Sequence, residues 1–288
     1  MIKDIPELID EVVQELRGFT DIAVLGLSGG ADSTLVALLC KIALGRENVY
    51  GVTMPSNHTY DLELEKKCND FAKSIGIHVL SSPIVKTLSG LTSTALLSLG
   101  SDSSPMDSLC YGNIKARLRM TTLYTICELI SKHKKLRCRV IGTGNLSEDF
   151  IGYATKYGDL GVDIHPIGDL FKSEVYQLLG WFKDRTYIID NLNGRWCVKW
   201  NYDKDDGIIQ EEFIDRVPSA HLWENQTDEE ELGMTYDEME PVIRQSLSGI
   251  TGKLAPKEII EETMALHLRN RHKIEAVPVI QLRKFFCD

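Results

Sequence analysis

Leu27-Ser28-Gly29-Gly30-Ala31-Asp32-Ser33-Thr34 is the stretch of sequence that decides the fold. The apolar residues 22–27 lead into it and predict a short buried strand, and the apolar spacing of residues 34–43 predicts a helix. Glycines after a strand let the backbone approach an anion closely, and the free N–H groups that begin the next helix attract negative charge. The stretch therefore predicts a phosphate-binding loop between a strand and a helix.

The loop differs from the common phosphate loop, Gly-x-x-x-x-Gly-Lys-[Ser/Thr], because it has no lysine and carries Asp32 instead. A carboxylate beside phosphates is favourable when a metal ion lies between them. Mg²⁺ prefers one or two carboxylates together with phosphate oxygens. The pattern thus favours a nucleotide bound with Mg²⁺, and the alternative is a glycine turn that only joins the strand to the helix.

Strands and helices alternate along the rest of the chain. A capping box at Asp4 and Glu7 begins a first helix. Further strands are predicted at residues 48–54, 77–80 and 139–142, and further helices at residues 62–75 and 113–131. This order is typical of an α/β fold with a doubly wound parallel sheet and helices on both faces. Ligands of such sheets bind at the carboxyl ends of the strands, here after Leu27, Met54 and Ile141.

The charge of the chain excludes some classes of partner. The 288 residues include 32 basic and 42 acidic ones, a formal net charge of −10. Residues 224–240 hold eight acidic residues and no basic one, and we interpret this block as a solvated loop or helix face. Phosphate backbones need a basic surface, so nucleic acid is disfavoured as a partner. The chain shows no signal peptide and no apolar run near the ~18 residues that span a bilayer, so we expect a cytoplasmic protein without membrane contact.

We expect a single domain over residues 1–288, because no repeat, low-complexity linker or clear boundary interrupts the pattern. Residues 184–206 are polar and turn-rich, with Trp196 and Trp200 among them, and predict an irregular excursion. The seven cysteines are widely spaced and contain no Cys-x-x-Cys pair. They are expected to be reduced thiols without a zinc or redox role.

The loop resembles the pyrophosphate loop of the N-type ATP pyrophosphatases, enzymes that cleave ATP to AMP and pyrophosphate. Six further segments resemble those of the ammonia-dependent NAD synthetases, a family within that superfamily. They are Gly112-Asn113-Ile114-Lys115-Ala116-Arg117-Leu118-Arg119-Met120, Gly142-Thr143-Gly144-Asn145-Leu146-Ser147-Glu148-Asp149, Thr155-Lys156-Tyr157-Gly158-Asp159-x-Gly161-Val162-Asp163, Pro166-Ile167-x-Asp169-Leu170-x-Lys172-Ser173, Pro218-Ser219-Ala220 and Arg271-His272-Lys273. The resemblance covers residues 26–273 in one order and implies an adenine nucleotide alpha hydrolase-like fold.

The resemblance also implies a set of site residues. ATP, the co-substrate, would be held by Gly26, Leu27, Ser28, Gly29, Gly30, Ala31, Asp32, Ser33, Thr143, Lys172 and Ser219. Deamido-NAD, the dinucleotide that ends in nicotinate, would be bound by Arg117, Lys156, Asp163, His272 and Lys273. Mg²⁺ would be ligated by Asp32 and Glu148. The family further implies a homodimer, in which the last of the deamido-NAD-binding residues commonly come from the partner subunit.

The residue chemistry by itself leaves alternatives open at several of these positions. Glu148 follows a strand end, where it could share a metal with Asp32, but a surface acid at a helix N-terminus has the same pattern. Lys172 opens an apolar helix and could equally be a surface lysine. Arg117 and Arg119 are two residues apart on a helix and so face different directions, and we favour Arg117 as the residue that binds a ligand group.

Two other predicted site residues have plain alternatives as well. Asp159 lies in a glycine-hinged segment and is interpreted as the proton acceptor for ammonium within a mobile lid; the alternative is a surface turn. His272 on its own would be a surface residue. His221 departs from the family pattern, which usually has an acidic residue at this position.

The hypothesis that follows is an ATP-dependent ligase with Lys172 and Asp159 as its catalytic residues. The nicotinate carboxylate would attack the α-phosphorus of ATP, and ammonia would then displace AMP from the acyl-adenylate to give NAD. Too few residues lie outside 26–273 for a glutamine-hydrolysing domain, so free ammonia or ammonia from a separate protein is expected. Two alternatives remain: an ATP pyrophosphatase that amidates a different nucleotide, and a nucleotide-binding module without turnover.

Overall fold

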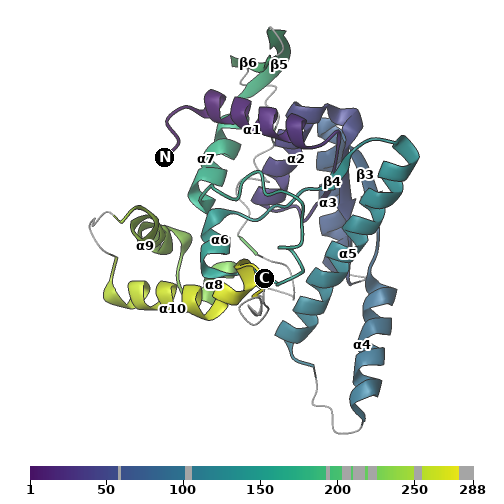
Figure 1. Cartoon of the computed structure of the whole chain (residues 1–288), viewed down its shortest axis with the longest axis vertical. Helices are drawn as coiled ribbons and strands as arrows, with labels where there is room; N and C mark the ends of the chain where they lie inside the picture. Colours follow the sequence, from purple (N-terminus) through teal and green to yellow (C-terminus); the bar gives the residue numbers. More distant parts are fainter. Residues whose placement is uncertain are drawn as a thin grey trace, which may run out of the picture.

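The structure of the chain is a computed structural model that describes residues 1–57, 60–100, 106–192, 195–202, 209, 218–219, 226–249 and 255–278. Within these residues, a four-stranded parallel sheet forms the centre and helices cover both of its faces (Figure 1). A second group of helices lies beside one end of this assembly (Figure 1). We call the two parts the sheet layer (β1–β4 with α1–α5 and α7) and the helical layer (α6 and α8–α10).

The elements of the first half of the chain are α1 (Ile5–Phe19), β1 (Ile22–Gly26), α2 (Ala31–Leu44), a 3-10 helix (Arg46–Asn48), β2 (Val49–Thr53), α3 (Tyr60–Ile75), β3 (His78–Ser81), α4 (Val85–Leu99), α5 (Ser108–Lys134) and β4 (Cys138–Val140). Those of the second half are α6 (Leu146–Ile151), α7 (Lys172–Phe182), β5 (Arg185–Leu192), β6 (Arg195–Tyr202), α8 (Asp228–Leu232), α9 (Tyr236–Ser248) and α10 (Lys257–Ile274). The strands and helices predicted between residues 22 and 142 are confirmed, whereas α4 was not predicted.

The strands of the central sheet lie in the order β3-β2-β1-β4, and all neighbouring pairs are parallel. Ala23 of β1 pairs with Val49 of β2 on one side and with Arg139 of β4 on the other. The predicted doubly wound parallel sheet is therefore confirmed. The strand order reverses beside β1, so the loop after β1 opens at the switch point where such sheets bind ligands.

Alternate residues of β1 belong to two different apolar cores. Ala23 and Leu25 pack with residues of α1, α2 and α7, and Ile22 and Val24 pack with residues of α5. All four side chains are buried. Because β1 is held from both faces, its carboxyl end and the loop that follows have a well-defined position.

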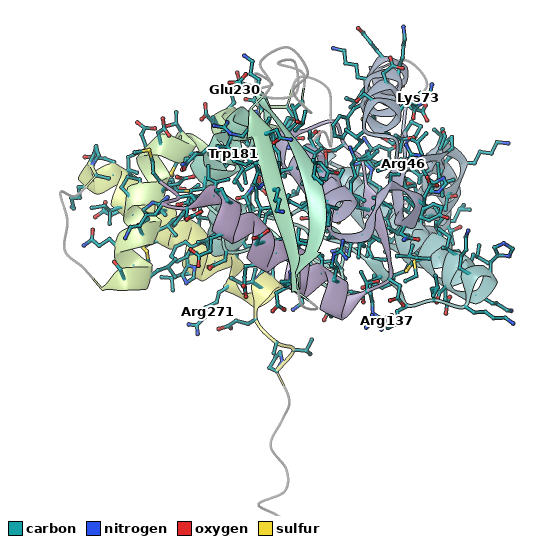
Figure 2. All side chains as sticks on the ribbon, turned by 90° about the horizontal axis from the view of Figure 1, so that it is seen from above. Arg46, Lys73, Arg137, Trp181, Glu230 and Arg271 are labelled. Atoms are coloured by element: carbon teal, nitrogen blue, oxygen red, sulfur yellow. The ribbon has the colours of Figure 1, made fainter. Side chains whose placement is uncertain are left out.

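The prediction of an irregular excursion at residues 184–206 is wrong for most of this range, because Arg185–Leu192 and Arg195–Tyr202 form two regular strands. Strands β5 and β6 pair antiparallel in a regular hairpin that forms a second, two-stranded sheet. The ring of Trp200 in β6 packs against Trp181 of α7 with ring centroids 4.5 Å apart, and Val198 N donates to Asp10 Oδ1 of α1 at 2.9 Å. Figure 2 looks down on this hairpin and shows it beside α1 and Trp181. Aromatic packing thus outweighs the turn-rich composition.

The helical layer has a core of its own, formed by α6, α9 and α10 with residues that include Phe150, Met239 and Leu266. The interpretation of residues 224–240 as a solvated face is wrong for two of its acidic residues, because Asp228 and Glu240 are only 2% and 4% exposed. Both carboxylates accept hydrogen bonds from donors in the interior, which makes their burial favourable. His221 lies outside the described residues.

Cys40, Cys68, Cys110, Cys127 and Cys138 are free thiols. The side chain of Cys197 and the whole of Cys287 lie outside the described part of the chain. None of the helices in the described ranges is both long and apolar enough to cross a membrane.

Candidate active site

A cavity of about 810 Å³ opens at the carboxyl ends of β1, β2 and β4. The glycine loop after β1 lines it, together with the segments that follow β2 and β4. Helix α5, the start of α7 and the end of α10 complete its walls. The cavity therefore lies where the parallel sheet predicts a ligand site, and both the sheet layer and the helical layer contribute to it.

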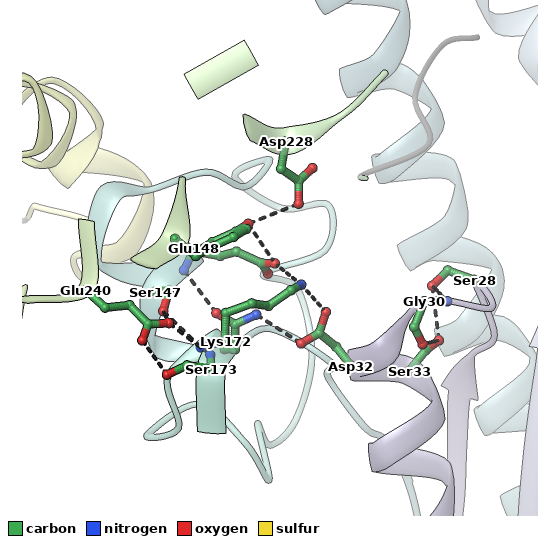
Figure 3. Close-up of polar contacts among 12 residues, drawn as sticks. Ser28, Gly30, Asp32, Ser33, Ser147, Glu148, Lys172, Ser173, Asp228 and Glu240 are labelled. Carbon is green, nitrogen blue, oxygen red and sulfur yellow. Dashed lines mark hydrogen bonds and ion pairs between the residues drawn. The ribbon is translucent and has the colours of Figure 1, made fainter. Parts of the chain in front are cut away.

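The glycine loop has a shape that suits an anion. Gly29 has a φ of 70°, a left-handed conformation that residues with side chains rarely adopt. Ser33 Oγ donates to the carbonyl oxygen of Gly30 at 3.1 Å and lies 3.0 Å from Ser28 Oγ (Figure 3). Gly30 is the N-cap of α2 and has no side chain to cover the first-turn N–H groups. These N–H groups and the helix dipole favour a phosphate at this point.

Lys172 lies between two carboxylates beside the loop. Its Nζ is 2.6 Å from Asp32 Oδ2 and 2.9 Å from Glu148 Oε1 (Figure 3). Asp32 comes from the first turn of α2, Glu148 from α6, and Lys172 is the first residue of α7. Only 4% of Lys172 is exposed, so the alternative of a surface lysine is wrong. Three residues that are far apart in the sequence thus form one charged cluster.

The charged groups of the cluster shift the pKa values of Glu148 and Lys172. Burial raises the pKa of Glu148 to about 8, Lys172 opposes this rise, and the nearby Asp32 adds to it. Burial alone would lower the pKa of Lys172, but Asp32 and Glu148 outweigh it and hold that pKa well above its usual value. The lysine is therefore a permanent cation next to the glycine loop. A fixed cation here can stabilise negative charge that develops on phosphate oxygens.

Three residues that the sequence did not single out support this cluster. Asn145 is fully buried, and its Nδ2 donates to Asp32 Oδ1 at 3.0 Å. Tyr236 OH donates to Asp228 Oδ2 at 3.0 Å and lies 3.4 Å from Glu148 Oε1. Asn145 had a signal, since it stands at the N-cap of α6 directly after Gly-Thr-Gly. Asp228 and Tyr236 had none, because they belong to the acidic block that reads as a solvated face.

The basic residues predicted for the second substrate line the same cavity. They are Arg117, Lys156, His272 and Lys273. Lys156 Nζ donates to the carbonyl oxygen of His272 at 2.6 Å, and Lys273 Nζ donates to that of Gly152 at 2.9 Å. The end of α10 thus reaches the cavity of its own chain. Arg119 lines the cavity as well, so both arginines of α5 contribute to its wall.

Asp159 also lines the cavity. Its Oδ1 accepts a hydrogen bond from the backbone N–H of Thr155 at 2.9 Å. Asp159 is exposed on the cavity side, and protein surrounds its carboxylate on the other sides. The partial loss of water around the carboxylate raises its pKa above the usual value. A higher pKa makes Asp159 a better proton acceptor than an ordinary surface aspartate.

Two of the predicted site residues, Asp163 and Gly29, are not among those that line the cavity. Asp163 Oδ2 accepts from Val140 N at 2.8 Å, and its Oδ1 accepts from Tyr124 OH at 3.2 Å. Its carboxylate therefore joins the segment after β4 to the sheet and to α5. The other residues predicted to hold ATP all line the cavity: Gly26, Leu27, Ser28, Gly30, Ala31, Asp32, Ser33, Thr143, Lys172 and Ser219.

Solved structures share this fold over nearly the whole chain. An NMN synthetase from Francisella tularensis superimposes with a TM-score of 0.72 at 26% identity, covering 96% of this chain and 98% of that one. The NH3-dependent NAD synthetase from Campylobacter jejuni superimposes with a TM-score of 0.63 at 24% identity, covering 96% and 100%. The fold is therefore the adenine nucleotide alpha hydrolase-like one.

The sequence comparisons identify the family within that fold. The family described as NAD synthase matches residues 1–277. The NH(3)-dependent NAD(+) synthetase of Methanococcoides burtonii is 39% identical over 249 residues, covering 86% of this chain and 80% of the relative. That of Wolinella succinogenes is 34% identical over 288 residues, covering 96% and 95%. The chain belongs to the NAD synthase family, and it is a carbon–nitrogen ligase.

Proposed function

We propose that this chain amidates deamido-NAD with ammonia in an ATP-dependent reaction that yields NAD, AMP and pyrophosphate. The observation that carries the proposal is the cluster around Lys172, whose Nζ lies within 2.9 Å of both Asp32 and Glu148 in the cavity that the glycine loop lines. A nucleotide-binding module without turnover has little need for a buried cation between two carboxylates. Membership of the NAD synthase family supports the same reaction.

The proposed reaction has two steps. A carboxylate does not react with ammonia, because an oxide ion is a poor leaving group. In the first step, one oxygen of the nicotinate carboxylate attacks the α-phosphorus of ATP, and the bond from that phosphorus to the bridging oxygen breaks, so pyrophosphate leaves. In the second step, ammonia attacks the acyl carbon of the adenylate, AMP leaves with the electron pair of the broken C–O bond, and the new C–N nitrogen releases one proton to the solvent to give the amide. The protein positions the reactants and provides no covalent nucleophile.

The groups of the cavity suit these steps. The N–H groups at the start of α2 and the ammonium group of Lys172 stabilise negative charge on the phosphate oxygens. Asp159 accepts the proton that ammonium must lose before nitrogen can attack. The raised pKa of this carboxyl is consistent with that role.

Asp32 and Glu148 are also suitable ligands for Mg²⁺, since both residues line the cavity beside the glycine loop that would hold the phosphates. Across the described residues, no group of three or more His, Cys, Asp or Glu side chains is arranged to hold a metal ion. The chain would therefore contribute these two carboxylates and leave the other positions to phosphate oxygens and water. When bound, Mg²⁺ supplies charge neutralisation for the departing pyrophosphate.

The proposal is tested by incubating purified protein with ATP, Mg²⁺, deamido-NAD and ammonium while NAD and AMP are both followed. We expect equal rates of formation of the two products and neither product without ammonium. AMP without NAD would show that a different acceptor is adenylated. Neither product, together with tight ATP binding, would support a binding module.

A second candidate is amidation of the mononucleotide that ends in nicotinate. It is favoured by the likeness to an NMN synthetase, the solved structure described above with the higher TM-score. The two candidate reactions use the same chemistry. Their substrates differ in that the dinucleotide carries an adenylate beyond the first phosphate and the mononucleotide ends there. The ratio of kcat/KM for deamido-NAD and for nicotinate mononucleotide separates them, and a higher value for the dinucleotide is expected.

The proposal includes a homodimer. Leu97 and Leu99 near the end of α4 are 82% and 69% exposed, and a second copy of the chain could cover this apolar pair. Light scattering should give a mass near twice the 32.4 kDa of one chain. A mass of one chain at assay concentration would contradict the dimer and leave the ligase proposal intact.

A further inference from the structure

Helix α7 begins at Lys172, and its first N–H groups are covered by residues from other helices. Its N-cap residue is Phe171, which makes no side-chain cap hydrogen bond. An uncovered helix start is unfavourable, because the first N–H groups have no partner within the helix. The position of this start also determines where the Lys172 side chain leaves the backbone.

The missing cap is supplied from α6 and α9. Lys172 N donates to Ser147 Oγ at 3.0 Å, and Ser147 Oγ in turn donates to Glu240 Oε1 at 2.9 Å. Ser173 N donates to the same Oε1 at 3.0 Å, and Ser173 Oγ donates to Glu240 Oε2 (Figure 3). The third N–H of the helix, that of Glu174, is covered by the carbonyl oxygen of Phe171 at 2.9 Å. The carboxylate of Glu240 thus closes a ring of hydrogen bonds around the start of α7.

The ring is built on a buried side-chain oxygen, Glu240 Oε1, which accepts from both Ser147 Oγ and Ser173 N. Glu240 is 4% exposed, and its negative charge lies at the positive end of the α7 dipole. Ser147 directly precedes Glu148 in the sequence, and Ser173 directly follows Lys172. Through these two serines, one carboxylate of α9 is connected to both partners of an ion pair in the cavity.

We infer that Glu240 is a positioning residue for the proposed reaction. It caps α7 from the helical layer and so places the Nζ of Lys172 against Asp32, Glu148 and the phosphates that the loop would hold. This inference rests on the proposed function, because it assigns Glu240 a role only through the charge that Lys172 provides. Glu240 does not line the cavity and touches no substrate.

The test compares Glu240→Ala with Glu240→Gln in the full chain. The alanine leaves Ser147 Oγ, Ser173 Oγ and the backbone N–H of Ser173 without their acceptor. We expect kcat to fall by about tenfold to a hundredfold, as for other small misplacements of catalytic groups. The KM for ATP should change by less than about threefold, since the loop that binds the phosphates is unaltered. The glutamine keeps one oxygen at the position of Oε1, so its kcat should stay within about threefold of the wild type.

A matched control lies on the same helix. Glu238 Oε2 accepts from the backbone N–H of Thr235 at 2.9 Å and caps α9 itself. Glu238 is exposed and does not line the cavity. Glu238→Ala should lower the melting temperature and leave kcat within about twofold of the wild type. If Glu240→Ala fails to fold, Ser147→Ala, which removes only the link between Lys172 N and Glu240, should show the same fall in kcat.

A kcat for Glu240→Ala within about twofold of the wild type would overturn the inference. The inference would also be overturned if Glu238→Ala lost as much kcat and as much stability as Glu240→Ala. Glu240 would then affect kcat only through stability. Failure of the proposed function is a separate result, since it shows in the wild-type protein as absence of NAD formation. In that case, the variants are compared by their rate of AMP release from ATP instead of NAD formation. The assay then contains the acceptor that the wild-type protein is found to adenylate.

Discussion

The sheet layer and the helical layer are held together by different kinds of contact. Around β1, the buried side chains are almost all apolar, and α2 buries most of its length against the sheet. In the helical layer, Asp228 and Glu240 are buried beside the apolar Met239 and Ile243. Apolar burial is non-directional, whereas hydrogen-bonded carboxylates require particular positions of their donors.

This difference suggests a division of tasks between the layers. The apolar sheet layer makes a rigid frame from which the glycine loop projects at the switch point of the strands. The helical layer provides polar groups whose geometry orients Lys172 and Glu148. Substitutions in the apolar core should therefore change stability more than activity, and substitutions in the polar contacts of the helical layer should do the reverse.

The largest effect is expected at Asp32, which the sheet layer projects into the cavity. Asp32→Asn keeps the shape of the side chain but removes the charge that faces Lys172 and that would ligate Mg²⁺. We expect the rate of NAD formation to fall by about 10²- to 10³-fold, similar to the loss of one electrostatic group in other active sites. The circular dichroism spectrum and melting temperature serve as the folding control. A rate within tenfold of the wild type would contradict the proposed role of Asp32.

The next largest effect tests the apolar side of the comparison. Leu16 of α1 is 1% exposed, packs on α2, and lies away from the cavity. Leu16→Ala should lower the free energy of unfolding by about 3 kcal/mol, through lost burial and a remaining cavity. Urea unfolding measures this loss, and kcat at a temperature where the variant is folded should match the wild type. A large fall in kcat of the folded variant would show that the apolar core of the sheet layer affects catalysis as well as stability.

Tyr236 tests the polar side. Tyr236→Phe removes the donor to Asp228 and the hydroxyl near Glu148, but keeps the ring in the core of the helical layer. We expect a loss of stability of about 1 to 2 kcal/mol and a fall in kcat of about threefold to tenfold, because a buried carboxylate loses a hydrogen bond. Steady-state kinetics and urea unfolding of the same preparation give both numbers. An unchanged kcat would place Tyr236 outside the catalytic arrangement.

The smallest effect is expected at His165, which lies against Gly142 and Gly144 where the two layers meet. Burial lowers the pKa of His165, so the folded protein favours the neutral ring. As pH falls below the unfolded pKa of about 6.5, the unfolded chain binds the proton first and stability is lost. The melting temperature of His165→Gln should therefore fall less steeply between pH 7 and pH 5 than that of the wild type. Parallel curves would show that His165 does not titrate differently on folding.

The sheet layer could be predicted from the sequence because its signals are local. The apolar run before Ser28, the glycines after it and the helical spacing of residues 34–43 each predict a structure without knowledge of the rest of the chain. The site residues Asp32, Glu148 and Lys172 could be named from the motifs, but the ion pairs among them depend on how three distant elements meet.

The helical layer could not be predicted in the same way. Glu240 and Glu238 are two residues apart in the same acidic block, yet one is buried and the other exposed. The burial of Glu240 is favourable because Ser147 and Ser173 donate hydrogen bonds to its carboxylate, and both serines are far from Glu240 in the sequence. The hairpin at β5 and β6 likewise depends on Trp181 and Asp10, which no local pattern connects to it.

The most direct test of the proposed chemistry is the fate of the carboxylate oxygens. Deamido-NAD labelled with ¹⁸O at both oxygens of its nicotinate carboxylate is incubated with the purified protein, ATP, Mg²⁺ and ammonium, and the products are analysed by mass spectrometry. Attack of the carboxylate on the α-phosphorus predicts that each AMP carries one ¹⁸O and that the amide of NAD retains the other. AMP without label, formed together with NAD, would contradict the acyl-adenylate and with it the role assigned to Lys172 and its two carboxylates.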